Sequence, residues 1–178
     1  MSSPLELIPV QDSVTRQAAE MLIREYLEFI RDKATHEYGL AFDIEAMAAT
    51  DLHDESKFFP PAGRFYVVRH AGQHIGVGCL KRLTPAVAEI QRMYIQPSAR
   101  GLGAGRFLLE RLLADARAMQ FQTVRLESLR ALSAAHTLYR SVGFREIAPY
   151  PDNSMKKYQP SEAMKAYISS ALFMELAL

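Results

Sequence analysis

The stretch EIQRMYIQPSARGLGAGR, residues 89–106, decides the fold. Its first half belongs to a β-rich run that is predicted to form a strand from Val87 to Gln96. Its second half holds alternate glycines from Gly101 to Gly105, directly before a run with helical periodicity. Glycines let backbone N–H groups approach an anion, and a helix N-terminus adds partial positive charge. The stretch therefore predicts a strand, an anion-binding turn and a helix in succession.

The segments that follow predict a parallel crossover. The helix is expected to continue to Phe121, and residues 123–127 read as the next strand. A second helix is expected over 131–142, with Gly143 as its stop. Because a strand, a helix and a strand follow one another here, the connection is expected to be right-handed.

The flanking sequence predicts antiparallel strands. Residues 65–69 and 74–80 are β-rich runs joined by a short connection that contains glycine, so they are expected to form a hairpin. The whole is α+β with a mixed sheet. Further elements are expected as strands over 5–10, 144–150 and 172–176, and as helices over 43–53 and 161–171.

A long amphipathic helix is expected near the start of the chain, capped by Asp12 or Ser13. The polar residues 32–39 are expected to form a loop after it. The residues with helical spacing predict a stripe that faces the core: Val14, Ala18, Met21, Leu22, Phe29 and Ile30.

Composition bounds the class of protein. The chain has 178 residues, of which 49% are hydrophobic, and this favours a single domain over 1–178. A formal net charge of +1 argues against a dedicated nucleic-acid binder. A single cysteine, Cys79, cannot pair within the chain, which favours the cytoplasm, and it is expected to be a buried structural thiol. No signal peptide or membrane-spanning run is seen, so no membrane partner is expected.

The glycine turn has features in common with two other phosphate-binding motifs. The P-loop does not fit, because no Gly-Lys-Ser or Gly-Lys-Thr follows. A dinucleotide-binding motif fits Gly101 and Gly103, with Glu127 near the place of the ribose-binding acid. Its third glycine would fall on Arg106, so this reading is kept as an alternative.

The spacing resembles that of the GNAT N-acetyltransferase superfamily. Arg100, Gly103 and Gly105 satisfy the pattern of its pyrophosphate loop. Residues 89–97 resemble its fourth strand. Residues 135–144 resemble its second signature, with an alanine, a leucine-tyrosine pair and a glycine-phenylalanine.

This resemblance implies a three-layer α+β fold, whose mixed, mostly antiparallel sheet is flanked by helices and splays in a V between the fourth and fifth strands. It also implies acetyl-CoA as co-substrate, with no metal. Backbone groups of Met93, Tyr94 and Ile95 would contact the pantetheine arm and the thioester. The pyrophosphate would be held by Arg100, Gly101, Leu102, Gly103, Ala104, Gly105 and Arg106.

The resemblance also implies catalytic residues. Tyr139 would be the general acid that protonates the departing CoA thiolate. Glu89 is the candidate base, and strand alternation would place it on one face with Gln91, Met93 and Ile95. Four residues of strand span about 13 Å, so Glu89 would need a water or a long substrate to act. A structural carboxylate paired with Arg92 or a helix residue is an equal alternative.

The acceptor implied is a primary amine on a small molecule or peptide, and a homodimer is compatible with the resemblance. A module that binds acyl-CoA without catalysis and a dinucleotide-dependent oxidoreductase remain the alternatives. Leu132 stands where many members carry an asparagine that contacts CoA. His136 is expected at the surface, and His70 and His74 lack a third metal ligand nearby. The segment 150–171 is longer than a tight connection, and its helix could cover the acceptor side.

Overall fold

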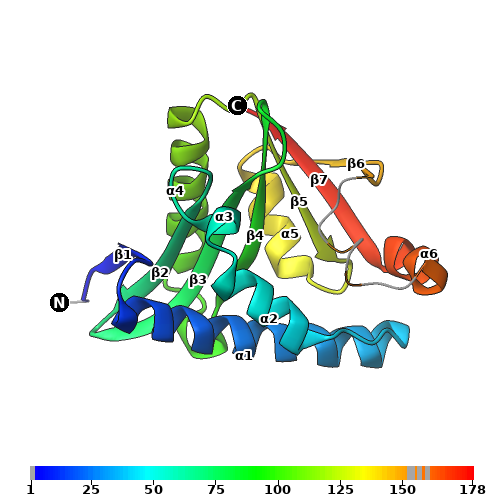
Figure 1. Ribbon diagram of the computed structural model, residues 1–178, viewed down its shortest axis with the longest axis horizontal. Helices are drawn as coiled ribbons and strands as arrows, with labels where there is room; N and C mark the ends of the chain where they lie inside the picture. The colour runs from blue at the N-terminus through cyan, green and yellow to red at the C-terminus, as the bar shows by residue number, and fades with distance from the viewer. Residues whose placement is uncertain (1–2, 152–154, 156–157, 159–160) are drawn as a thin grey trace.

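A seven-stranded mixed sheet with the order β1-β2-β3-β4-β5-β7-β6 forms the centre of the structure (Figure 1). The structure is a computed structural model that describes residues 3–151, 155, 158 and 161–178. The first four strands pair antiparallel with one another in chain order. The β2–β3 turn has positive φ at Ala71 and Gly72, as a tight hairpin requires, so the predicted hairpin is confirmed. These strands are β1 (Leu5–Pro9), β2 (Arg64–His70), β3 (Gln73–Arg82) and β4 (Val87–Ile95).

A crossover joins β4 to a parallel neighbour. After β4 the chain passes through a short 3-10 turn (Pro97–Ala99) and α4 (Ala104–Ala118), and returns as β5 (Thr123–Leu129). The last strand, β7, lies antiparallel between β5 and β6. The predicted crossover and mixed α+β sheet are confirmed. The remaining elements of this half are α5 (Ser133–Ser141), β6 (Arg145–Ile147), α6 (Ser161–Ser170) and β7 (Ala171–Ala177).

Helices cover both faces of the sheet, which gives the three layers expected (Figure 1). On one face, α1 (Ser13–Tyr38) and α2 (Ile44–His53) bury their apolar side chains, together with the short α3 (Glu55–Phe58). On the other face, α4 and α5 pack on a second cluster of buried side chains. The β4–β5 junction therefore has a different set of helices above and below it.

The first helix is longer than the sequence predicted. It begins at a capping box in which Asp12 Oδ1 accepts from the Thr15 amide at 2.8 Å. It runs through the predicted loop over 32–39 and ends at Gly39, whose φ is +66°. Ala34 is fully buried one turn after Ile30, so the core-facing stripe continues and the loop prediction is wrong.

The predicted stripe on this helix is also wrong in part. Val14 is 65% exposed and Met21 is 53% exposed, so neither faces the core. The face of the helix that packs on the sheet is rotated about the helix axis relative to the predicted stripe. Its buried members are Thr15, Ala18, Ala19, Leu22, Ile23, Leu27, Ile30 and Ala34.

The C-terminal part agrees with the prediction except for one strand. The strand expected over 144–150 is reduced to β6, because only Arg145, Glu146 and Ile147 pair with β7. The final helix and strand are confirmed as α6 and β7. Within the described residues, none of the helices has the length and apolar character needed to cross a membrane.

Candidate active site

The β4–β5 junction opens into a V. The two strands are paired for only three residues each, and the last pair is Glu89 with Arg125. Beyond that pair, β4 stays bonded to β3 and β5 stays bonded to β7, so the two strands diverge. The facing edges from Ile90 and Leu126 onward lack a strand partner within the described part of the chain. An extended ligand can pair with these edges.

A bulge in β4 re-aims the side chains at the V. Cys79 is opposite Gln91 and Val77 is opposite Tyr94, so two residues of β4 oppose one residue of β3. One of the two, Arg92, has a φ of +54°. The bulge shifts the alternation by one residue. The odd-numbered side chains before it therefore lie on a different face from the odd-numbered side chains after it.

The prediction of one shared face is therefore wrong. Glu89 and Gln91 lie on the α1 and α2 face, because Gln91 is opposite Cys79 of that core. Met93 and Ile95 pack against the α4 and α5 core instead. Tyr94 returns to the α1 face, where its hydroxyl donates to Glu25 Oε1 at 2.8 Å. Burial and then this hydrogen bond raise the pKa of Tyr94 to about 12.

The glycine turn leaves backbone donors unused. Gly101 and Gly103 have φ of +86° and +80°, in the region that favours glycine. Gly103 is the N-cap of α4 and provides no side-chain cap, unlike Asp12 at the start of α1. Within the described residues, the amides from Gly101 to Arg106 donate to no backbone carbonyl or side chain. Six consecutive donors without acceptors at a helix N-terminus are an arrangement that suits an anion.

The side chains of the turn lie around this site. Arg100 lies over the Phe29 ring, with its guanidinium carbon 5.8 Å from the centroid. The Arg106 guanidinium donates to Ser141 Oγ at 2.8 Å. Leu102 is 47% exposed, and Ala104 is buried. At Gly105 an added Cβ would lie 3.3 Å from the Leu138 side chain, so α4 and α5 approach closely there.

Tyr139 lies on the buried face of α5. Its side chain is 6% exposed, and its ring centroid is 5.8 Å from that of Phe144. Burial raises the pKa of its phenol, and the nearby Tyr26 phenol adds to the rise. The hydroxyl is therefore protonated at neutral pH, as a general acid requires.

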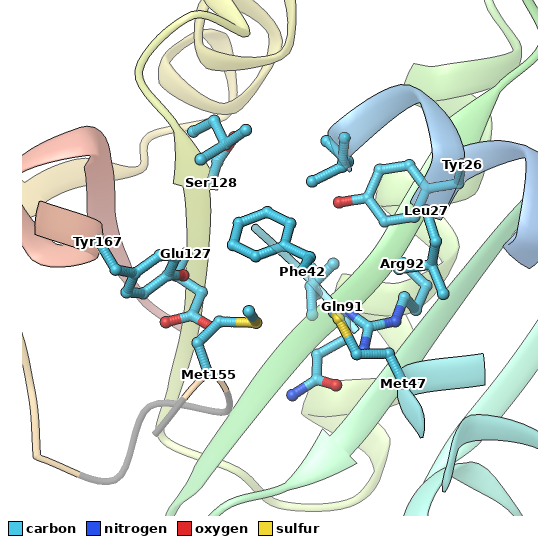
Figure 2. Close-up of a pocket in the computed structure, with 13 residues that line it drawn as sticks. Tyr26, Leu27, Phe42, Met47, Gln91, Arg92, Glu127, Ser128, Met155 and Tyr167 are labelled. Atoms are coloured by element: carbon cyan, nitrogen blue, oxygen red, sulfur yellow. The ribbon is translucent and has the colours of Figure 1, made fainter. Parts of the chain in front are cut away.

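A cavity opens on the α1 and α2 side of the V (Figure 2). Its empty space, counted together with the part that is open to solvent, is about 500 Å³. One wall comes from α1, α2 and β4, and the other from β5 and the segment between β6 and β7 (Figure 2). The residues that line it are Tyr26, Leu27, Ile30, Phe42, Met47, Ile90, Gln91, Arg92, Glu127, Ser128, Leu129, Met155 and Tyr167. Met155 and Tyr167 come from the 150–171 segment that was expected to cover this side.

Glu89 is placed behind the cavity wall. It is fully buried and does not line the cavity. Its oxygens accept from the Gln91 amide and, at 2.7 Å, from the Tyr150 hydroxyl. Burial raises the pKa of this carboxyl. The alternative in which Glu89 pairs with Arg92 is absent from the described contacts, because Arg92 binds Asp51 instead.

A buried ion cluster includes Arg92, which is part of the β4 wall of the cavity. Asp51 of α2 is fully buried and contacts both Arg92 and Lys57. The Arg92 Nε and Nη2 atoms donate to the two carboxylate oxygens. A guanidinium held at two points has a fixed orientation.

The sequence missed several residues of the site. Glu127 and Tyr26 line the cavity, whereas the sequence pattern relates Glu127 only to a ribose-binding acid. His136 is 4% exposed, so its predicted surface position is wrong: its Nε2 is 3.1 Å from Ser128 Oγ. Burial lowers the pKa of His136. Leu132 is the N-cap of α5 and offers no side-chain cap.

The structure also bears on the predicted thiol and on possible metal ligands. Cys79 is a buried free thiol, as predicted, and burial raises its pKa well above the ordinary value. In the part of the chain that the structure covers, His, Cys, Asp and Glu side chains form no group of three or more that could hold a metal ion.

Comparison with known proteins gives consistent matches. The model of a family described as the acetyltransferase (GNAT) family matches residues 17–144. A protein of Azospirillum brasilense named IAA acetyltransferase is 32% identical over 143 residues, which cover 80% of this chain and 83% of that protein.

Solved structures show the same fold. An acetyltransferase from Streptococcus agalactiae 2603 has a TM-score of 0.70 at 18% identity, and 98% of each chain is covered. The PaiA N-acetyltransferase of Thermoplasma acidophilum, solved in complex with coenzyme A, has a TM-score of 0.66 at 16% identity. That match covers 98% of this chain and 99% of the other.

Proposed function

The chain belongs to the acetyltransferase (GNAT) family and is an acyltransferase that uses acyl-CoA, and from this premise we propose that it transfers the acetyl group of acetyl-CoA to a primary amine. The acceptor is an amine of a small molecule or peptide that enters the cavity on the α1 and α2 side of the V.

The uncapped N-terminus of α4 carries this proposal. Six consecutive amides from Gly101 to Arg106 have no backbone or side-chain acceptor within the described residues. A diphosphate is the kind of anion that such an array binds, because several amides and the helix dipole act on one dianionic group. Arg100 and Arg106 stand beside the turn and can add charge-assisted bonds.

The pantetheine arm of acetyl-CoA would extend along the open edge of β4. The edge that faces β5 has no strand partner from Ile90 to Ile95 within the described part of the structure. Backbone groups of Met93, Tyr94 and Ile95 would pair with the arm and with the thioester carbonyl. An N–H aimed at that carbonyl oxygen stabilises the negative charge that develops there.

The reaction balances with Tyr139 as general acid. The lone pair of the neutral amine attacks the thioester carbonyl carbon and forms the C–N bond. The C–S bond then breaks, and the Tyr139 phenol gives its proton to the CoA sulfur. The excess proton on the nitrogen returns to the phenolate, directly or through water. The products are the N-acetylated acceptor and CoA.

Glu89 is proposed to position a neighbour. Its carboxylate accepts from the Gln91 side-chain amide, and Gln91 lines the cavity while Glu89 does not. A direct role as base would require the carboxylate to reach the acceptor, and Glu89 is fully buried.

A charge placed in the glycine turn tests the donor site. Leu102→Asp adds a negative charge beside the amides. Leu102→Asn places a side chain with the shape of Asp, but without the charge, at the same position. Because Leu102 is 47% exposed, both variants should fold. Isothermal titration should show acetyl-CoA binding at least about 10-fold weaker for the Asp variant than for the Asn variant. Equal affinity of the two variants would refute the assignment of the turn, and NAD, another diphosphate, serves as the specificity control.

A release assay tests the reaction. CoA thiol should appear when acetyl-CoA is mixed with a library of primary amines, and mass spectrometry should find the N-acetylated product. Binding of acetyl-CoA without transfer to any amine would identify a binding module instead.

A further inference from the structure

The cavity has walls of opposite charge. Figure 2 shows Arg92 and Gln91 on the β4 side and Glu127 on the β5 side. Much of the remaining lining is apolar, so water screens these groups less than at a surface. The apolar members are Leu27, Ile30, Phe42, Met47, Ile90, Leu129 and Met155.

Arg92 is held ready to bind an anion. The Arg92 Nε and Nη2 atoms donate to the Asp51 carboxylate, and the Arg92 Nη1 atom makes no hydrogen bond among the described residues. Asp51 also contacts Lys57, so one carboxylate is shared between two cations. A planar guanidinium fixed from behind suits a carboxylate better than a flexible ammonium would.

Gln91 presents an acceptor for which the described part of the chain offers no partner. Its Nε2 donates to Glu89, which is fixed in turn by Tyr150, and this orients the amide. Its Oε1 is buried and has no hydrogen-bond partner among the described residues, although Gln91 lines the cavity. A buried acceptor of this kind is costly unless a ligand donates to it.

Glu127 supplies the negative wall. It lies on β5 in the register position opposite Phe173, which turns its side chain to the α1 face. It accepts a hydrogen bond from Tyr167. Burial raises the pKa of the Tyr167 phenol well above its ordinary value, and the charge of Glu127 adds to the rise. A carboxylate in this position can take a proton from an ammonium group.

We infer that the acceptor is an amino acid, that is, a small amine that carries its own carboxylate. This inference rests on the proposed function. The carboxylate binds the Arg92 guanidinium, and the ammonium donates to Gln91 Oε1 and to Glu127. Glu127 accepts one ammonium proton, which leaves the neutral amine that attacks the thioester, and later releases that proton to solvent.

Matched acceptors test the inference on the unaltered enzyme. Each of alanine, aspartate, leucine and phenylalanine is compared with its α-carboxamide and with the amine that lacks the α-carboxylate. For the acids that react, kcat/KM should exceed that of the carboxamide by about 10- to 100-fold, as expected for loss of a bond between charged groups. Equal kcat/KM for acid and amide, or faster transfer to peptide N-termini, would overturn the inference while the proposed function stands. Absence of transfer to any amine would overturn both.

Two variants separate the roles. Arg92→Gln should bring the acid-to-amide ratio to within about threefold of one, and Arg92→Lys should restore part of it. Glu127→Gln should lower kcat/KM for acids and amides alike, by about 10²-fold or more, and keep the ratio. Arg31→Gln, at an exposed ion pair on α1, is the control and should change neither quantity. An unchanged ratio in a folded Arg92→Gln variant would refute the assignment.

Discussion

Replacing Tyr139 by Phe removes one oxygen and keeps the packing. The ring is 6% exposed and lies 5.8 Å from the Phe144 ring, and both features survive the change. Among the described residues the hydroxyl makes no hydrogen bond, so no buried partner is left unsatisfied. The free energy of unfolding should therefore change by less than about 1 kcal/mol. Loss of a general acid should lower kcat by about 10²- to 10⁴-fold, or roughly 3–5 kcal/mol in the barrier.

The assay measures stability and turnover on the same preparation. Urea unfolding gives the stability, and CoA release at saturating acetyl-CoA and acceptor gives kcat. The KM for acetyl-CoA should stay near that of the unaltered enzyme, because the proposed cofactor site is the backbone of the turn and not Tyr139. Tyr38→Phe, at the last residue of α1, removes a phenol oxygen from a residue that does not line the cavity and should leave kcat unchanged. A kcat for Tyr139→Phe within about threefold of the unaltered enzyme would refute the general-acid assignment.

Three further outcomes are expected. Gly39→Ala should cost about 1 kcal/mol of unfolding free energy, measured in urea, because φ is +66° there and an added Cβ meets nothing within 4 Å. Burial and the bond to Glu25 raise the pKa of Tyr94 to about 12, so this contribution to stability is complete below pH ~10 and is lost as the pH rises through about 12. A tyrosinate absorbance titration should show Glu25→Gln shifting this phenol to lower pH, and an unmoved titration would contradict the contact. Asp51→Asn should cost about 3–5 kcal/mol in urea unfolding, because Arg92 and Lys57 lose their buried carboxylate, and a loss below about 1 kcal/mol would count against the cluster.

Local pattern predicted the elements better than their ends. The crossover around β4, α4 and β5 was predicted from periodicity and glycine positions, because both are local properties. The end of α1 was missed, because residues 32–39 are mostly polar, and the last turns contact the core through the buried Ala34 and the partly buried Tyr38. Burial of a small residue depends on what lies beneath it, which one segment does not reveal.

The bulge explains the main error at the site. Strand alternation put Glu89 and Met93 on one face, and the extra residue at Arg92 separated them. The sequence around Arg92 has no glycine or proline to mark a bulge. The bulge is visible only in the register with β3, which is a property of two strands.

Pairing also explains why the polar groups of the cavity were missed. Glu127 and Gln91 come from different strands and line the same cavity because the V opens between those strands. His136 is buried because α5 turns it toward Ser128 of β5. Each of these residues looks ordinary in its own segment, so its role depends on tertiary contacts.

The position of β7 bears on the order in which this site assembles. Each residue of β5 from Thr123 to Leu129 pairs with β7, and past the three β4 pairs this is the only strand that holds β5 within the described residues. One side of the V therefore stays unsupported until residues 171–177 have been synthesised and have inserted between β5 and β6. Folding of β2, β3 and β4 can precede that event, since their pairings join strands that are neighbours in the sequence. Catalytic competence should thus appear as a late step in refolding, after the antiparallel half has gained its protection against hydrogen exchange.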